Sequence, residues 1–135
     1  MPSADLAAIY RGYIDCLNRQ AWDELHRFVA DDVRRNARLL GLSGYRNMLV
    51  EDFEAIPDLA FHIEHLVCDP PMVASRLRFD CTPAGMLFGL PVNGRRVQFT
   101  ENVFYEFDDA GRIRNVWSVI DTAAVAAQIA DAGRD

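Results

Sequence analysis

Residues Val97–Asp121 read VQFTENVFYEFDDAGRIRNVWSVID and carry the strongest pattern in the chain. Two alternating apolar runs, Arg95–Phe107 and Arg112–Ile120, flank the turn residues 108–111, Asp-Asp-Ala-Gly. An alternation with a period of two is typical of strands, and a glycine-containing turn between two such runs predicts a β-hairpin. The stretch ends at Asp121, which can also begin a helix.

The register of this hairpin decides which side chains share a face of the sheet. If the hairpin closes around Ala110, one face carries two cross-strand pairs, Asn102 with Ser118 and Phe104 with Val116. The other face then carries Glu101, Tyr105, Trp117 and Val119. Periodicity does not decide which face lines a pocket, because both faces are mixed. A subunit interface would account for the second mixed face, and we expect a homodimer through the sheet.

The segments before the hairpin predict helices first and strands later. Apolar residues recur at helical spacing in Leu6–Leu17, in a shorter segment Trp22–Val29 and in Tyr45–Ile56. Alternating runs follow at Phe61–Cys68 and Val73–Asp80, and we expect a flexible connection over Thr82–Gly94 and a final helix over Thr122–Ala132. Segregated order of this kind predicts an α+β fold. We expect a cone-shaped, curved antiparallel β-sheet that encloses a pocket with the three N-terminal helices, followed by a short C-terminal helix.

Length and composition predict one domain over residues 1–135. The net charge of -6 argues against a nucleic-acid surface, and no apolar run approaches the roughly 20 residues that span a bilayer. The N-terminus lacks the pattern of a signal peptide. Three cysteines without CxxC spacing indicate reduced, mostly buried thiols, so we expect a cytoplasmic protein. The charge and the short apolar runs predict neither nucleic-acid nor membrane partners, and the enclosed pocket predicts a hydrophobic small-molecule ligand.

Asp121 allows two interpretations. At the end of a strand it could act as a carboxylate general base at the mouth of a pocket, taking a proton next to a carbonyl group. Before an alanine-rich helix it could instead be the N-cap, accepting bonds from free backbone N–H groups. The two conflict, because a capping carboxylate has a lowered pKa and is a weaker base.

Other polar and aromatic residues are candidates for orienting a substrate. Ser118 could hydrogen-bond a carbonyl, and the amide of Asn36 could reach the cavity, although it lies in a basic run typical of a solvated surface. Tyr45 and Trp117 could contact the ligand or belong to the core. No Ser-His-Asp arrangement is evident. His62 and His65 do not form a recognisable ligand set, so we expect no metal.

Three stretches resemble one known family. They are AIPDLAFHIEHLV at Ala55–Val67, FDCTPAGMLFGLPVNGRRVQF at Phe79–Phe99 and ENVFYEFDDAGRIRNVWSVID at Glu101–Asp121. They are similar to SnoaL-like proteins, the polyketide cyclase or "ester cyclase" group of the nuclear transport factor 2-like superfamily. The pattern T-P-x-G-x-x-x-G-x-P-x-x-G, present at Thr82–Gly94, is fairly specific to this group.

The resemblance implies a cone-shaped α+β barrel, usually a homodimer, without metal or cofactor. It also implies an intramolecular aldol ring closure, in which a pocket aspartate acts as acid and base. Ser118 falls nearest the acidic position of the cyclases, and Asn102 and Phe104 fall where cyclases tend to have polar or histidine pocket residues. Arg35 stands before Asn36 where many relatives have His-Asn.

The leading hypothesis is therefore a cyclase-like enzyme that acts by proton transfer on a hydrophobic carbonyl substrate. Asp121 is the predicted catalytic residue. The predicted substrate contacts are Asn36, Tyr45, Asn102, Phe104, Trp117 and Ser118. The alternatives are a ketosteroid isomerase-like isomerase or a dehydratase, and a non-catalytic small-molecule-binding module of the same fold.

Overall fold

The structure is a computed structural model and describes residues 1–132. Residues 133–135 of the predicted domain lie outside the described residues. The elements in chain order are α1 (Ser3–Asn18), the 3₁₀ helix η1 (Trp22–Arg27), β1 (Val29–Arg35), β2 (Arg38–Leu39), α2 (Gly41–Ala55), β3 (His62–Asp69), β4 (Met72–Cys81), β5 (Met86–Leu87), β6 (Leu90–Pro91), β7 (Val97–Phe107), β8 (Ile113–Ile120) and α3 (Thr122–Ala132).

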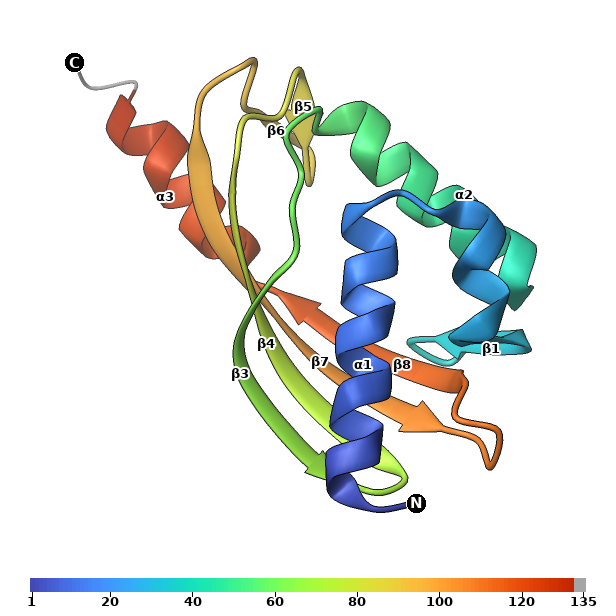
Figure 1. Ribbon diagram of the computed structural model, residues 1–135. Coiled ribbons are helices and arrows are strands. Elements are labelled where there is room, and N and C mark those ends of the chain that lie inside the picture. Colours follow the sequence, from blue (N-terminus) through green and yellow to red (C-terminus); the bar gives the residue numbers. More distant parts are fainter. Residues whose placement is uncertain (133–135) are drawn as a thin grey trace.

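Six strands form one curved sheet in the order β2-β1-β8-β7-β4-β3. The helices α1 and α2 lie on one side of this sheet, and α3 leaves the far end of β8 (Figure 1). The predicted α+β class, with early helices, a curved sheet and a short C-terminal helix, is confirmed. One detail differs from the predicted antiparallel sheet, because β1 pairs with β8 in parallel.

The inner face of β7 is mostly apolar. Phe99, Val103, Tyr105 and Phe107 point inward and are buried, whereas Gln98, Asn102 and Phe104 are exposed on the outer face. Glu101 lies on the inner face, in line with these apolar residues. The alternation decides here what the sequence pattern left open: the face that carries Glu101 is the one turned toward the helices.

The predicted register of the hairpin is wrong by one residue over most of its length. Phe107 pairs with Ile113, as closure around Ala110 requires, but the next pair is Glu106 with Asn115. Arg114 is therefore an extra residue on β8, which is a β-bulge. Because side chains alternate between faces, one extra residue moves every later side chain of β8 to the opposite face.

The bulge gives β8 a different inner face from the predicted one. Val103 pairs with Ser118, Tyr105 with Val116, and Glu101 with Ile120. Asn102 and Phe104 instead pair with Val119 and Trp117 on the outer face. Ser118 thereby shares a face with Glu101, and Trp117 does not.

Two connecting segments also differ from expectation. The segment predicted as a short helix from Trp22 is the 3₁₀ helix η1, which ends at Arg27. The connection predicted as flexible, Thr82–Gly94, contains the two-stranded hairpin β5-β6, with Phe88 and Gly89 at its tip. Both turn residues have left-handed backbone angles, with φ of 52° at Phe88 and 75° at Gly89.

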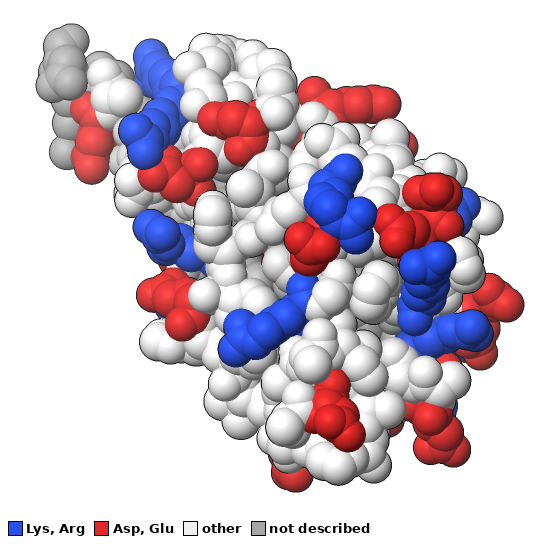
Figure 2. Space-filling view, in the orientation of Figure 1, with Lys and Arg blue, Asp and Glu red and all other residues white. Residues whose placement is uncertain are grey.

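Charged residues of both signs alternate over the face seen in Figure 2, without an extended basic stripe on that side. Within residues 1–132, no helix is both long and apolar enough to cross a membrane.

Asn18 joins the end of α1 to the start of β3. Its side-chain amide donates to the carbonyl oxygen of Phe61 at 3.0 Å, and its Oδ1 accepts from the Phe61 N–H at 2.7 Å. Both backbone groups of Phe61 are thus satisfied by one side chain. The pair fixes the position of Phe61, whose ring is part of the core.

Replacing Asn18 tests this connection between α1 and the start of β3. Asn18→Ala removes both bonds and leaves the Phe61 N–H and C=O unpaired, so the free energy of unfolding should fall by about 1–3 kcal/mol. Urea denaturation measures the change. Asn47→Ala, at an exposed position on α2, is the matched control and should stay within about 0.5 kcal/mol of the wild type. Equal stability of the two variants would contradict the role of Asn18.

Candidate active site

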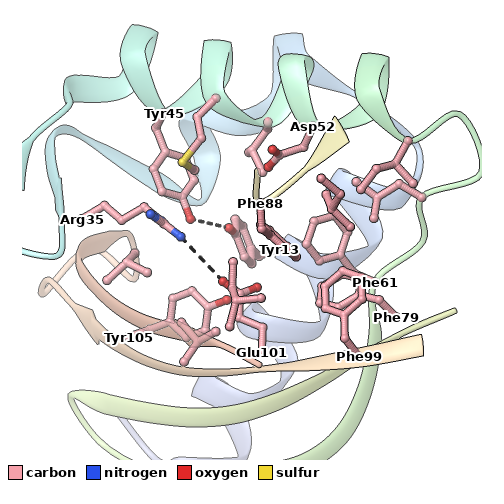
Figure 3. A pocket seen from close by; sticks show the side chains of 18 residues that line it. Tyr13, Arg35, Tyr45, Asp52, Phe61, Phe79, Phe88, Phe99, Glu101 and Tyr105 are labelled. Atoms are coloured by element: carbon pink, nitrogen blue, oxygen red, sulfur yellow. Dashed lines mark hydrogen bonds and ion pairs between the residues drawn. The ribbon is translucent and has the colours of Figure 1, made fainter. Parts of the chain in front are cut away.

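A cavity of about 210 Å³ lies between the inner face of the sheet and the helices. Eighteen residues from α1, α2, the connection between α2 and β3, the sheet and the β5-β6 hairpin line it, and Figure 3 shows their side chains converging on one space. Only Asp52 and Phe88 among them are exposed, so the mouth of the cavity lies between α2 and the β5-β6 hairpin. The other lining residues are buried or half-buried.

One end of the cavity is aromatic. The rings of Phe79 and Phe99 stack with centroids 5.0 Å apart and an interplanar angle of 24°. Phe61 packs edge-on against Phe79 at 5.2 Å, and Phe88 packs edge-on against Phe99 at 5.4 Å. Such a wall offers flat apolar contact area to a planar ligand.

The other end of the cavity holds a half-buried carboxyl group, that of Glu101. Ser118 Oγ donates a hydrogen bond to Glu101 Oε2, and Arg35 Nη2 lies 3.7 Å from the same oxygen. Arg35 Nη2 also donates to Ser118 Oγ at 3.3 Å. Both contacts of Glu101 use Oε2, so among the described residues Oε1 has no hydrogen-bond partner.

Burial raises the pKa of Glu101, and the hydrogen bond from Ser118 and the positive charge of Arg35 oppose part of that rise. The Glu101 side chain keeps 14% of its surface exposed and that of Arg35 keeps 27%. A carboxyl group with a raised pKa and one free oxygen is a stronger base than an exposed carboxylate, and it can accept a proton and later return it.

Arg35 reaches this position because of the tight turn between β1 and β2. Asn36 and Ala37 occupy left-handed backbone angles, with φ of 48° and 68°. The Asn36 N–H donates to the carbonyl of Val116 at 2.8 Å, and Asn36 Oδ1 accepts from the Ser118 N–H at 3.0 Å. Asn36 thereby fastens the turn to β8 and holds the neighbouring Arg35 against Ser118.

Three tyrosines add hydroxyl groups to the cavity: Tyr13, Tyr45 and Tyr105. The hydroxyl oxygens of Tyr13 and Tyr45 lie 2.6 Å apart, so one O–H donates to the other and the second O–H stays free for a ligand. Burial raises the pKa of both phenols, which therefore remain protonated at neutral pH. In Figure 3 this pair lies on the same side of the cavity as Arg35.

A second carboxyl group, that of Asp52, stands at the mouth on α2. It makes no hydrogen bond or ion pair with another described residue. Partial burial against the apolar wall, reinforced by the negative charge of Glu101, raises the pKa of Asp52 to about 6. Two carboxyl groups thus face one cavity, from α2 and from the sheet (Figure 3).

The predicted site residues fall into three places. Tyr45 lines the cavity, and Ser118 and Asn36 support its polar end through Glu101 and Arg35. Asn102, Phe104 and Trp117 lie on the outer face of the sheet, away from the cavity. Asn102 and Phe104 lie there because of the alternation along β7, and the bulge in β8 places Trp117 beside them. Asp121 is exposed, and its Oδ1 accepts the Ala124 N–H at 3.1 Å as the cap of α3.

The position of Asp121 does not support the predicted role as the base, since Asp121 does not line the cavity. The cavity groups that sequence reasoning missed are Glu101, Arg35, Asp52 and Tyr13. One signal for Glu101 was available: it is the single carboxylate within the apolar series Phe99, Val103, Tyr105 and Phe107. Nothing in the local pattern marks Asp52, whose position depends on how α2 packs.

Clusters of ligand-type side chains are the usual mark of a metal site. Within residues 1–132, no group of three or more His, Cys, Asp or Glu side chains is placed to hold a metal ion.

The chain has an α+β fold with a pocket between its helices and a curved sheet, and carboxyl and phenol groups line that pocket. This combination is typical of small-molecule-binding proteins. The model of the SnoaL-like polyketide cyclase family matches residues 7–129. The chain therefore belongs to this family, as its sequence motifs predicted. A comparison with curated proteins gave no match.

Solved structures agree with this assignment. A SnoaL-like polyketide cyclase from Agrobacterium tumefaciens is 55% identical, with 96% of this chain and 99% of that chain covered and a TM-score of 0.91. TsrD from Streptomyces laurentii is 18% identical over 95% of this chain and 96% of its own, with a TM-score of 0.83. IdmH from Streptomyces antibioticus is 19% identical over 93% and 98%, with a TM-score of 0.80. At such low identity the last two show the fold alone.

The raised pKa of Asp52 predicts a pH-dependent effect on stability. The folded chain holds this proton more tightly than the unfolded chain, so ionisation of Asp52 lowers stability as the pH rises from about 4 to about 6. Asp52→Asn should therefore raise Tm at pH 7.5 and change it little at pH 4. Because the residue is exposed, solvent screening limits the gain to about 1 kcal/mol or less, or roughly 2–4 °C.

Thermal denaturation at the two pH values measures this effect. The matched control is Glu51→Gln, which removes a charge from the neighbouring exposed residue outside the cavity. A rise in Tm of equal size at pH 4 and pH 7.5 in Asp52→Asn would contradict the raised pKa of Asp52.

Proposed function

We propose that the protein is a cyclase-type enzyme that moves a proton on a hydrophobic carbonyl compound, with Glu101 as acid and base. The observation that carries this proposal is a carboxyl group with one free oxygen inside an apolar cavity, on the side that also holds a pair of phenol hydroxyls. Membership of the SnoaL-like polyketide cyclase family supports the same reaction class.

The first step follows from the placement of these groups. Glu101 Oε1 takes a proton from the carbon next to a carbonyl group, and the electron pair of the broken C–H bond moves onto the carbonyl oxygen. The free O–H of the Tyr13–Tyr45 pair donates a hydrogen bond to that oxygen and stabilises its negative charge. Arg35 and Ser118 hold Glu101 in place and keep Oε2 paired throughout.

The second step closes a ring. The enolate carbon attacks another carbonyl carbon of the same molecule, a carbon–carbon bond forms, and the attacked oxygen becomes an alkoxide. The proton held by Glu101 then returns to this alkoxide, which leaves Glu101 ionised and the product neutral. Holding both carbonyl groups in one cavity supplies proximity, which is a large part of the barrier reduction in reactions of this kind.

Proton abstraction can be tested without knowing the natural substrate. 1-Tetralone has an acidic C–H bond next to its carbonyl, and proton NMR in deuterium oxide follows the loss of that signal. The wild type should exchange it above the buffer rate, and Glu101→Gln should reduce the enzyme-dependent rate by about 100-fold or more. Asp121→Asn is the control and should retain the rate, since Asp121 caps α3 outside the cavity.

Other outcomes of these experiments would favour the other hypotheses. Exchange that survives in Glu101→Gln and disappears in Asp121→Asn would restore Asp121 as the base. Thermal stabilisation by 1-tetralone without any exchange would favour the non-catalytic binding module. Isomerised or dehydrated products from suitable ketones, without ring closure, would favour the isomerase or dehydratase.

We also propose that two copies pair through the outer face of the sheet. Val67, Ala74, Phe104 and Trp117 are cross-strand neighbours on β3, β4, β7 and β8 and form one apolar row. Val67 is 65%, Phe104 55% and Trp117 41% exposed, which is unusual for an apolar row in water.

We also propose a cytoplasmic location. The free thiols of Cys16, Cys68 and Cys81 are compatible with the reducing conditions there.

A charge placed in this row should separate the copies. Phe104→Arg is expected to convert a dimer into a monomer in sedimentation velocity, because it would bury an unpaired guanidinium at the interface. Met86→Arg, at an equally exposed apolar position on β5, is the control and should stay dimeric. A wild type that sediments as a monomer at all concentrations would contradict the proposed dimer.

A further inference from the structure

The two carboxyl groups of the cavity have different surroundings. Glu101 is held by Ser118 and Arg35, whereas Asp52 has no partner among the described residues. Asp52 stands at the mouth beside Phe88, on the opposite wall from Glu101 (Figure 3). A ligand that fills the cavity would cover Asp52 and take it away from water. Such a carboxylate needs a hydrogen-bond donor from the ligand.

The size of the cavity restricts what fits inside it. Its volume of about 210 Å³ lies above the roughly 150 Å³ of a dry cavity that accepts benzene. It lies below the ~300–1,000 Å³ typical of pockets for drug-sized ligands. The stacked pair Phe79 and Phe99, with Phe61 and Phe88 at its edges, gives this space a flat apolar wall. The enclosed part of the ligand is therefore planar and contains one or two rings.

The charges of the cavity select against an anion. Arg35 is its one guanidinium, and Glu101 and Ser118 already occupy Arg35 Nη2. The lining carboxyl groups, Glu101 and Asp52, outnumber it. A ligand carboxylate would meet two carboxyl groups and one guanidinium whose Nη2 already faces Glu101 and Ser118, so a neutral ligand is favoured.

On this basis, and resting on the proposed function, we propose that Asp52 is a substrate-recognition residue. The substrate is a neutral, planar hydroxy- or enol-bearing carbonyl compound whose enclosed part has one or two rings. It directs its carbonyl toward Glu101 and the Tyr13–Tyr45 pair, and its hydroxyl or enol O–H toward Asp52 at the mouth. The aromatic wall holds the ring between these two ends.

Three probes that share one two-ring body test the proposal. They are 6-hydroxy-1-tetralone, 6-methoxy-1-tetralone and 1-oxotetralin-6-carboxylate, and isothermal titration calorimetry at pH 7.5 gives their Kd values. The hydroxy probe should bind the wild type about tenfold more tightly than the methoxy probe, the size expected of one charge-assisted hydrogen bond. The carboxylate probe should bind most weakly.

The matched variants assign the preference to one side chain. In Asp52→Ala the hydroxy and methoxy probes should bind within about twofold of each other, as expected once the charge-assisted bond is absent. Glu51→Ala removes the same charge one residue away, outside the cavity, and should keep the tenfold preference. Circular dichroism of both variants confirms that each is folded before the titrations.

Several outcomes would overturn the proposal: equal affinity of the hydroxy and methoxy probes for the wild type, tightest binding of the carboxylate probe, no binding of any probe, or a preference that survives in Asp52→Ala. Deuterium exchange on the hydroxy probe separates this result from the proposed function. Preferential binding without exchange would support the recognition role of Asp52 and contradict Glu101 as the base. Exchange without a preference for the hydroxy probe would support Glu101 as the base and contradict the recognition role of Asp52.

Discussion

One extra residue in β8 determines the face on which the rest of the site is built. The bulge at Arg114 places Val116, Ser118 and Ile120 on the inner face of the sheet. A regular hairpin would have turned Trp117 and Val119 inward and left Ser118 in solvent. Since Ser118 is the hydrogen-bond donor to Glu101 and the acceptor from Arg35, the polar end of the cavity depends on this bulge.

The cavity combines groups that would be unfavourable if each were buried alone. A carboxyl group in an apolar space is costly unless it is paired, and Arg35 and Ser118 pair only one oxygen of Glu101. The remaining oxygen of Glu101 and the second O–H of the Tyr13–Tyr45 pair stay available for a ligand. The Asn36 turn contributes from outside the cavity, because it fastens β1 to β8 and so fixes Arg35.

Most of the fold could be predicted from sequence because its signals are local. The period-two runs gave the strands near their observed ends, and helical spacing gave α1 and α2. The bulge could not be predicted, because Arg114 has no side-chain feature that marks it as the extra residue. The bulge puts Trp117 on the outer face and Ser118 on the inner face, the reverse of the predicted arrangement relative to Glu101. Asn102 and Phe104 lie on the outer face because the inner face of β7 is the one that carries Glu101, which periodicity alone could not decide. Asp121 was correctly given a capping alternative, and the bond to Ala124 is that cap. Asp52 and Tyr13 reach the cavity only through the packing of helices on the sheet, which no local pattern encodes.

Glu101, rather than a residue at the end of β8, is the group that we place next to the reacting carbon of a bound carbonyl compound. A crystal structure of the protein with 6-hydroxy-1-tetralone tests this placement most directly. We expect the rings against Phe79 and Phe99, with the carbon next to the carbonyl about 3–3.5 Å from Glu101 Oε1. Three results would contradict the account. The ligand density could lie at Asp121, it could lie on the outer face of the sheet, or it could lie in the cavity with the carbonyl end turned away from Glu101.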